Sequence, residues 1–299
     1  MIRISSEYVT DILDKNNPPV AYCNDGDTII FETRDCYDGT VTCEERPYGD
    51  RADGLENPAT GPLYIKGAMV GDVLKVEILD IKVAHQGIMR TSPTAGAFHE
   101  AYDKKTARIF PIENGKVPFD DKLSLDIDPM IGVIGTAPSE DGILTDTPDY
   151  HGGNMDCNQI VKGSILYLPV CVEGALLSMG DLHALMGDGE VLICGLEIAG
   201  EVTVKVSVVK DCILPTPFLV NRGKAMTIQS AFTLDEAAKM AATKMFEFLT
   251  LVMDGNKVNA GMLMSLKSDM RVCQIVDPKK TIRVELPMDV FSTYRYTMP

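Results

Sequence analysis

The sequence predicts a mostly β protein, a sandwich or barrel followed by a small α+β unit. Short apolar runs recur after Gly-Asp turns, where Asp25-Gly26-Asp27 precedes residues 28–33 and Gly71-Asp72 precedes residues 73–79. Such turn-then-strand units favour a sandwich or barrel over alternating strands and helices. Helical periodicity is confined to the C-terminal part. We therefore predict a β-rich body over residues 1–215, which carries the site, and an α+β unit over residues 216–299.

The first half of the chain alternates strands with irregular segments. Residues 73–79 alternate apolar and polar side chains with period two, as expected of a half-buried strand. A polar segment follows residue 34 and ends in Asn57-Pro58-Ala59-Thr60-Gly61-Pro62, whose two prolines and one glycine fix an irregular loop. A loop of this length is usually functional or disordered. Residues 86–125 show little periodicity and remain unassigned. Residues 128–138 form an apolar run punctuated by glycine, which suits a buried strand where backbone approaches backbone or ligand.

For the second half of the chain the sequence predicts strands, then two helices, then two further strands. Apolar runs at residues 165–170 and 191–196 read as strands on either side of a polar, Gly-rich loop. Thr233 and Glu236 form a capping box that begins a helix, and Asp254-Gly255 ends it. A shorter helix at residues 258–266 follows. Two further strands are predicted at residues 270–276 and 281–286.

Composition excludes several classes of partner. The 299-residue chain has a formal net charge of −15, which disfavours nucleic acid and anionic membranes because the protein's field repels polyanions. No segment approaches the ~20 apolar residues that span a bilayer. The N-terminus lacks an apolar signal core, so we expect a cytoplasmic protein. The eight cysteines are expected to be reduced thiols, as in other large chains without a signal peptide. Because they include no Cys-x-x-Cys pair, a structural zinc knot is not expected.

Two segments concentrate residues that support chemistry. Residues 180–190 carry three carboxylates, one of the four histidines and three glycines, and residues 151–156 repeat the combination of His, Asp and Gly. Polar loops at the end of a β-scaffold commonly hold functional side chains. The two segments could therefore converge on one metal ion or one polarised water. No Gly-x-Ser-x-Gly elbow, His-Glu-x-x-His helix or phosphate loop is present.

Imidazole nitrogens and carboxylate oxygens are suitable ligands for zinc and similar ions. Suitable ligands here are His151, Asp156, Asp181 and His183, with Asp35 as a further candidate at the end of an earlier strand. A metal lowers the pKa of bound water from about 15.7 towards roughly 7, which gives a nucleophile at neutral pH. Glu190 could then act as general base. Asp188, between Gly187 and Gly189, is interpreted as a turn residue.

Four motifs resemble the acetamidase/formamidase family. They are Asn57-Pro58-Ala59-Thr60-Gly61-Pro62, Gly132-Val133-Ile134-Gly135, His151-Gly152-Gly153-Asn154-Met155-Asp156, and Gly180-Asp181-Leu182-His183 through Gly187-Asp188-Gly189-Glu190. The resemblance runs in the expected order from Thr28 to Leu286, and its last two motifs are the most specific.

The resemblance implies an amidohydrolase that cleaves formamide or acetamide to ammonia and a carboxylate. The two His/Asp/Gly segments lead us to expect that a metal-activated water performs the attack. The resemblance also implies jelly-roll-like and barrel-like β parts, a homodimer, and a bound divalent metal, zinc in particular, with calcium as the alternative. Carried over residue by residue, it yields a set of site residues. We predict Glu190 and Asp181 as catalytic, Asp35, His151, Asp156 and His183 as metal ligands, and Asn57, Thr60, Gly135 and Asn154 as substrate-binding.

Two alternatives remain open at this stage. The same acidic loops suit hard cations, so the chain could be a non-catalytic β-sandwich that binds calcium or a small ligand. A thiol amidase centred on Cys157 would be inactivated by alkylation and indifferent to chelators. Neither alternative requires a different fold.

Overall fold

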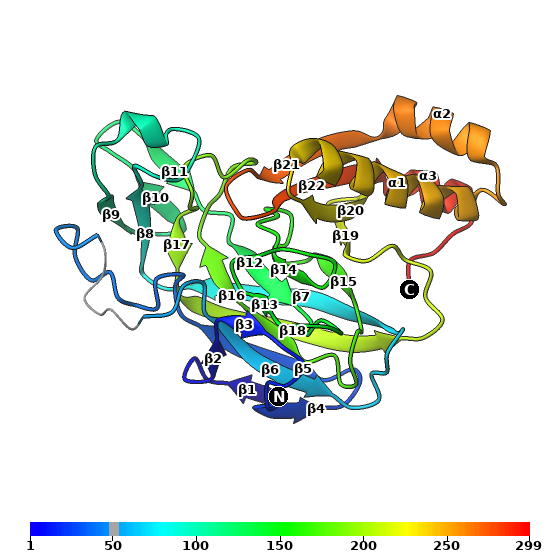
Figure 1. Ribbon diagram of the computed structural model, residues 1–299, viewed down its shortest axis with the longest axis horizontal. Helices are drawn as coiled ribbons and strands as arrows, with labels where there is room; N and C mark the ends of the chain where they lie inside the picture. The colour runs from blue at the N-terminus through cyan, green and yellow to red at the C-terminus, as the bar shows by residue number, and fades with distance from the viewer. Residues whose placement is uncertain (48–53) are drawn as a thin grey trace.

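A computed structural model describes residues 1–47 and 54–299 of the chain. Within these ranges two nine-stranded sheets and two short strand pairs make up most of the molecule, and three α-helices lie in its C-terminal part (Figure 1). The predicted mostly β class is thereby confirmed. No helix in the described ranges is long and apolar enough to cross a membrane.

The first sheet joins strands from all parts of the chain. Its order is β1 (Ile2–Ile4), β5 (Thr28–Thr33), β18 (Gly200–Val209), β7 (Val73–Val83), β15 (Ile165–Pro169), β19 (Phe218–Asn221), β20 (Lys224–Ala231), β22 (Lys280–Pro287) and β21 (Asp269–Gln274). All neighbours are antiparallel except β1 and β5. Because β15 pairs with β19, the sheet continues from the body into the segment after residue 215.

The second sheet carries most of the functional segments. Its main order is β14 (Gly152–Asn154), β12 (Met130–Gly135), β16 (Leu177–His183), β17 (Glu197–Ile198), β8 (Gln86–Thr91) and β9 (Thr106–Pro111), and β6 (Ala59–Ile65) joins β16 to β2 (Val9–Thr10) and β4 (Ala21–Cys23). The short pairs are β10 (Lys116–Pro118) with β11 (Ser124–Asp126), and β3 (Ile12–Leu13) with β13 (Ile143–Leu144). A short 3₁₀ helix spans His99–Ala101.

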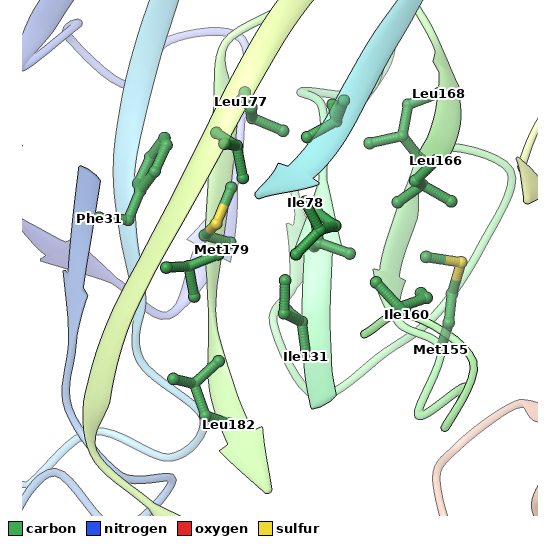
Figure 2. Packing of buried hydrophobic residues seen from close by; sticks show 14 of the residues in the cluster. Phe31, Ile78, Ile131, Met155, Ile160, Leu166, Leu168, Leu177, Met179 and Leu182 are labelled. Atoms are coloured by element: carbon green, nitrogen blue, oxygen red, sulfur yellow. The ribbon is translucent and has the colours of Figure 1, made fainter. Parts of the chain in front are cut away.

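A buried apolar layer holds the two large sheets together. Figure 2 shows Phe31 and Ile78 of the first sheet facing Ile131, Met179 and Leu182 of the second. All five are almost fully buried. Removing this apolar surface from water, at about 25 cal/mol per Å², supplies the main favourable free energy for packing the sheets.

The C-terminal helices cover one part of the first sheet. They are α1 (Leu234–Val252), α2 (Lys257–Lys267) and α3 (Met288–Thr293). The predicted capping box is present, because Thr233 Oγ1 accepts from the Glu236 backbone N–H at 3.2 Å and bonds the Glu236 side chain at 3.0 Å. Phe248 of α1 packs between Phe218 and Phe291 in a second apolar cluster.

The predicted strand at residues 191–196 is wrong, since the structure places this apolar run in an irregular loop. Its backbone turns repeatedly, with positive φ at Glu190 and Ile193, and such a chain cannot keep a strand's extended conformation. The unassigned residues 86–125 form the hairpin of β8 and β9 and the short pair β10 and β11.

Candidate active site

One buried histidine organises the polar centre of the molecule. His183 ends β16, and its Nε2 lies 3.1 Å from Glu197 Oε1, 3.7 Å from Asp181 Oδ2 and 3.8 Å from Asp156 Oδ1. All four side chains are almost fully buried. A single imidazole therefore faces three carboxyl groups from strands β16 and β17 and from the segment after β14.

The backbone is strained at three acidic residues of this centre. Asp156, Asp181 and Glu190 have φ values of 42°, 55° and 43°, a region that residues other than glycine rarely adopt. Such conformations cost about 1–3 kcal/mol each and concentrate at functional sites. Asp181 has this backbone conformation within β16 (Leu177–His183), two residues before His183.

Two glycines let the polar groups approach the backbone. A Cβ at Gly132 on β12 would lie 2.5 Å from both Asp156 Oδ1 and Asp181 Oδ2. A Cβ at Gly195 would lie 2.5 Å from His183 Nδ1. These distances are too short for van der Waals contact, so only glycine fits at either position. A Cβ at Gly132 would also lie 2.8 Å from the Asp181 backbone carbonyl oxygen, so the close approach of backbone to backbone expected in the run 128–138 occurs here.

The described residues form two groups with the geometry of a cation site. Ligand atoms of Asp156, His183 and Glu190 all lie within 4.8 Å of one another, and so do those of Cys36, Asp181 and Glu197. Several atoms in these groups are buried without a hydrogen-bond partner, namely both Asp156 carboxylate oxygens, Glu190 Oε2 and Glu197 Oε2. Buried polar atoms are normally partnered, and a divalent cation would satisfy oxygens placed like these.

Burial controls the protonation of the centre. It raises the pKa of Asp156 to about 6 and that of Glu197 to about 7, while the pKa of Glu190 rises well above its ordinary value for the same reason. Burial also disfavours the charged form of His183, but the carboxylates of Glu197 and Asp181 outweigh this effect and raise its pKa. Other protein groups therefore do not fully balance the negative charge of these carboxylates.

A cavity of about 300 Å³ opens beside this centre. Of the predicted residues, Asn57, Asn154, Asp181 and Glu190 line it. Asn154 Oδ1 is buried and has no partner. At the wall, the Arg90 guanidinium stacks 3.6 Å from the centre of the Tyr37 ring. The cavity thus combines acidic groups, an amide and a cation within reach of a small polar molecule.

Four other predicted site residues lie outside both groups and the cavity lining. Asp35 Oδ1 accepts from the Tyr37 and Gly39 backbone N–H groups, which shapes the turn after β5. Thr60 Oγ1 donates to the Glu32 carbonyl at 2.7 Å. Gly135 lies in the ladder between β14 and β16.

The fourth, His151, is fully buried, and neither ring nitrogen has a hydrogen-bond partner. Burial lowers the pKa of His151 to about 4. The imidazole is therefore neutral at physiological pH and stands apart from the His183 cluster. The structure does not bring together the two histidines that the sequence predicted as joint ligands.

Three residues of the site escaped the sequence interpretation: Cys36, Glu197 and Asp277. Cys36 is adjacent to the predicted Asp35, and Glu197 interrupts the apolar run Leu196-Glu197-Ile198. A lone carboxylate in an apolar run is a usable signal, because burial of an unpaired charge is costly. Asp277 comes from the C-terminal segment and lines the cavity, and burial and the neighbouring Asp156 carboxylate raise its pKa.

A buried glutamine fixes the loop that carries Asp277. Gln274 Oε1 accepts from the backbone N–H groups of Val276 and Asp277 at 2.9 and 3.1 Å. Its Nε2 donates to the Lys279 carbonyl and to Thr281 Oγ1 at 2.6 and 3.1 Å. Because one side chain bonds both sides of the turn, the position of Asp277 depends on it.

Cys157 is fully buried and is not part of the cavity lining. Burial opposes its ionisation, but Cys273 and the positive charge of Arg283 outweigh burial and lower its pKa. Arg283 in turn binds Asp188 through two hydrogen bonds of 2.6 and 2.8 Å. The site therefore does not present Cys157 to a substrate, and Asp188 does more than form a turn.

Comparisons with known proteins agree with the motifs. A model of the acetamidase/formamidase family matches residues 9–147 and 140–293. The crystal structure of an acetamidase from Bacillus halodurans has a TM-score of 0.95 and 48% identity, covering 98% of this chain and 99% of that chain. A structure described as a predicted acetamidase/formamidase, from the thermophile Thermoanaerobacter tengcongensis, has a TM-score of 0.96 and 39% identity, covering 99% of each chain.

Curated relatives are longer than the region they share with this chain. An acetamidase of Mycolicibacterium smegmatis is 33% identical over 138 residues, which cover 43% of this chain and 32% of that protein. The aligned regions cover from 18% to 61% of the curated relatives' own lengths.

Proposed function

Because the chain belongs to the acetamidase/formamidase family, we propose that it hydrolyses small aliphatic amides, of which formamide and acetamide are the first to test. Water and the amide yield ammonia and a carboxylic acid. The observation that carries the proposal is His183, which is buried among three carboxyl groups beside a polar cavity of about 300 Å³.

The residues of the centre fit a divalent cation. Asp156, His183 and Glu190 offer two oxygens and one nitrogen within 4.8 Å of one another, a donor set that suits zinc. Both Asp156 oxygens and Glu190 Oε2 are otherwise unpartnered. When bound, such a cation supplies a Lewis acid that polarises a carbonyl group and lowers the pKa of water. We propose zinc as the resident ion, with calcium as the alternative.

The side chains around the cavity can orient the amide and transfer a proton. Asn154 Oδ1 can accept a hydrogen bond from the N–H group of an amide and thereby orient it. Glu190 borders both the cation group and the cavity, so one of its oxygens can hold the ion while the other takes a proton. Asp181 adds a further carboxylate between the His183 ring and the cavity.

The decisive experiment measures ammonia release from formamide and acetamide, before and after chelation, with metal analysis of the same sample. We expect activity to disappear with the chelator and to return with zinc. His183→Ala should lose both activity and bound metal, whereas His85→Ala, at a histidine outside the site, should keep both. A metal-loaded sample that releases no ammonia from either amide would refute the proposed hydrolysis.

We also propose that the enzyme is a cytoplasmic homodimer. The resemblance to the family supports the dimer. Light scattering coupled to size-exclusion chromatography would give a mass of two chains.

A further inference from the structure

A second set of cation ligands adjoins the His183 group. Cys36 lies in the loop after β5, Asp181 on β16 and Glu197 on β17, and their ligand atoms all lie within 4.8 Å of one another. All three side chains are buried, and all three line the cavity. Three separate segments of the chain therefore meet at one point beside the proposed substrate.

An unpartnered atom points to a missing ligand at this place. Glu197 is 2% exposed. Its Oε1 faces His183 Nε2 at 3.1 Å, whereas its Oε2 is buried without any hydrogen-bond partner. Leaving such an oxygen unsatisfied costs about 1–3 kcal/mol, and more when the group is charged. A cation between Glu197, Asp181 and Cys36 would remove this cost.

We propose that Cys36, Asp181 and Glu197 form a second divalent-cation site, of the zinc class, next to the one held by Asp156, His183 and Glu190. The inference builds on the proposed function, because it adds an ion to the same cavity. Zinc–sulfur bonds are about 2.3 Å long and zinc–oxygen bonds about 2.0–2.2 Å. Small side-chain rotations would bring the three ligand atoms, which lie within 4.8 Å of one another, to these distances from one ion. Thiolate selects zinc over calcium, which takes oxygen ligands.

Asp181 lies between the two sites. Its carboxylate belongs to the Cys36 group, and its Oδ2 is also 3.7 Å from His183 Nε2. The left-handed backbone at Asp181, with φ 55°, is the conformation that holds the carboxylate at this junction. Paired ions about 3.5–4 Å apart are a common arrangement in hydrolytic enzymes. The strained residue thus has a place in both ligand sets.

Cobalt substitution tests the site by a signal that does not depend on turnover. Apoprotein loaded with excess Co²⁺ and then desalted should retain two ions per chain and show a near-ultraviolet sulfur-to-cobalt charge-transfer band. Cys36→Ser should retain one ion and lose the band. The matched control is Cys194→Ser, which removes a neighbouring cavity thiol outside the ligand set and should keep both ions and the band. A band that survives Cys36→Ser, or that vanishes with Cys194→Ser alone, would overturn the proposal.

A measurement on the unmodified protein covers the case in which Cys36→Ser fails to fold. Zinc-edge X-ray absorption of the zinc-loaded wild-type chain should show sulfur at about 2.3 Å beside nitrogen and oxygen ligands. A first shell of nitrogen and oxygen alone would overturn the second site. Ammonia release from the same sample separates the two ideas. Amide hydrolysis without zinc-bound sulfur would reject only the second site, and zinc-bound sulfur without hydrolysis would reject only the amidase function.

Discussion

Gly132 sets the position of two carboxylates of the site. A Cβ at this residue would meet Asp156 Oδ1 and Asp181 Oδ2 at 2.5 Å, so Gly132→Ala must displace both oxygens. We expect kcat/KM for ammonia release to fall by about 100-fold, because displacements of about 1 Å at a site have effects of that size. Overpacking should lower the free energy of unfolding by about 1–3 kcal/mol.

The matched control for this substitution is Gly261→Ala in α2. A Cβ there meets nothing closer than 3.7 Å, and alanine favours a helix over glycine by about 1 kcal/mol. This variant should keep full activity and gain stability. Full activity in Gly132→Ala would contradict the role assigned to Gly132.

His151 should make stability depend on pH in one direction. Burial lowers its pKa to about 4 in the folded chain, against about 6.5 in the unfolded chain. Between these two pKa values the unfolded state binds more protons than the folded state. The free energy of unfolding therefore increases as the pH rises and decreases as the pH falls. This difference in the pKa of His151 corresponds to about 3 kcal/mol in the free energy of unfolding.

Urea unfolding at pH 7 and pH 4.5 checks this prediction. His151→Leu removes the titrating ring, and its loss of stability on acidification should be smaller than that of the wild type by most of that amount. An equal loss in both proteins would show that His151 does not stay neutral in the folded state.

Sequence reasoning found the residues that carry their own local signal. Asp156, Asp181, His183 and Glu190 stand among glycines in polar segments, and the structure gathers them around one centre. Cys36 and Glu197 each stand alone in the sequence. They become part of the site only because β5 and β17 end beside β16, and this spatial proximity leaves no periodic pattern in the chain.

At the scale of elements, the loop after β21 depends on one side chain. Gln274→Met would remove the partners of two backbone N–H groups and one carbonyl. These backbone groups are partly buried, so together we expect their loss to lower the free energy of unfolding by about the 1–3 kcal/mol of one fully buried unsatisfied group, or to disorder the loop. Asp277 would then leave the cavity wall, and kcat/KM should fall as well.

Gln86→Met, at an exposed position of β8, is the control for the same change of side chain. It should alter neither the denaturant midpoint nor kcat/KM. If Gln274→Met behaved like this control, the loop would be held by other contacts.

Elements with strong local patterns were predicted well. The strand at residues 28–33 matches β5, and the capping box at Thr233 begins α1. Residues 191–196 look like a strand because they are apolar, but they pack as a loop against the pair β8 and β9 around an apolar cavity. Burial against a neighbour produces the same composition as burial within a sheet, so composition alone could not separate them.

At the scale of the whole molecule, the first sheet runs through the predicted boundary at residue 215. Five strands precede this boundary and four follow it, in one hydrogen-bonded order. The loop after β21 also reaches the cavity through Asp277, and Gly189 bonds Cys273 and Ile275 through its backbone. The site that we predicted within residues 1–215 therefore receives part of its wall from the C-terminal segment.

The buried carboxyl groups of the centre should make the stabilisation of the folded protein by a bound cation depend on pH. In the cation-free chain the pKa values of Asp156 and Glu197 are raised to about 6 and about 7, against ordinary values of about 4 in the unfolded chain. Between about pH 4 and 7 the folded state therefore binds more protons, and the free energy of unfolding falls as pH rises. A bound cation keeps both carboxylates ionised and removes this loss.

Chelation should consequently destabilise the protein more at pH 7.5 than at pH 5. Urea midpoints with and without chelator at both pH values give the comparison, and the His151 contribution cancels because it is the same in both forms. The pKa shift of each carboxyl corresponds to about 3 kcal/mol in the free energy of unfolding. The effect of the chelator should therefore differ measurably between the two pH values. Glu197→Gln removes one of these carboxyls and should reduce the pH dependence of the chelator effect. An effect of chelation that is equal at both pH values would show that no cation neutralises these carboxylates in the folded protein.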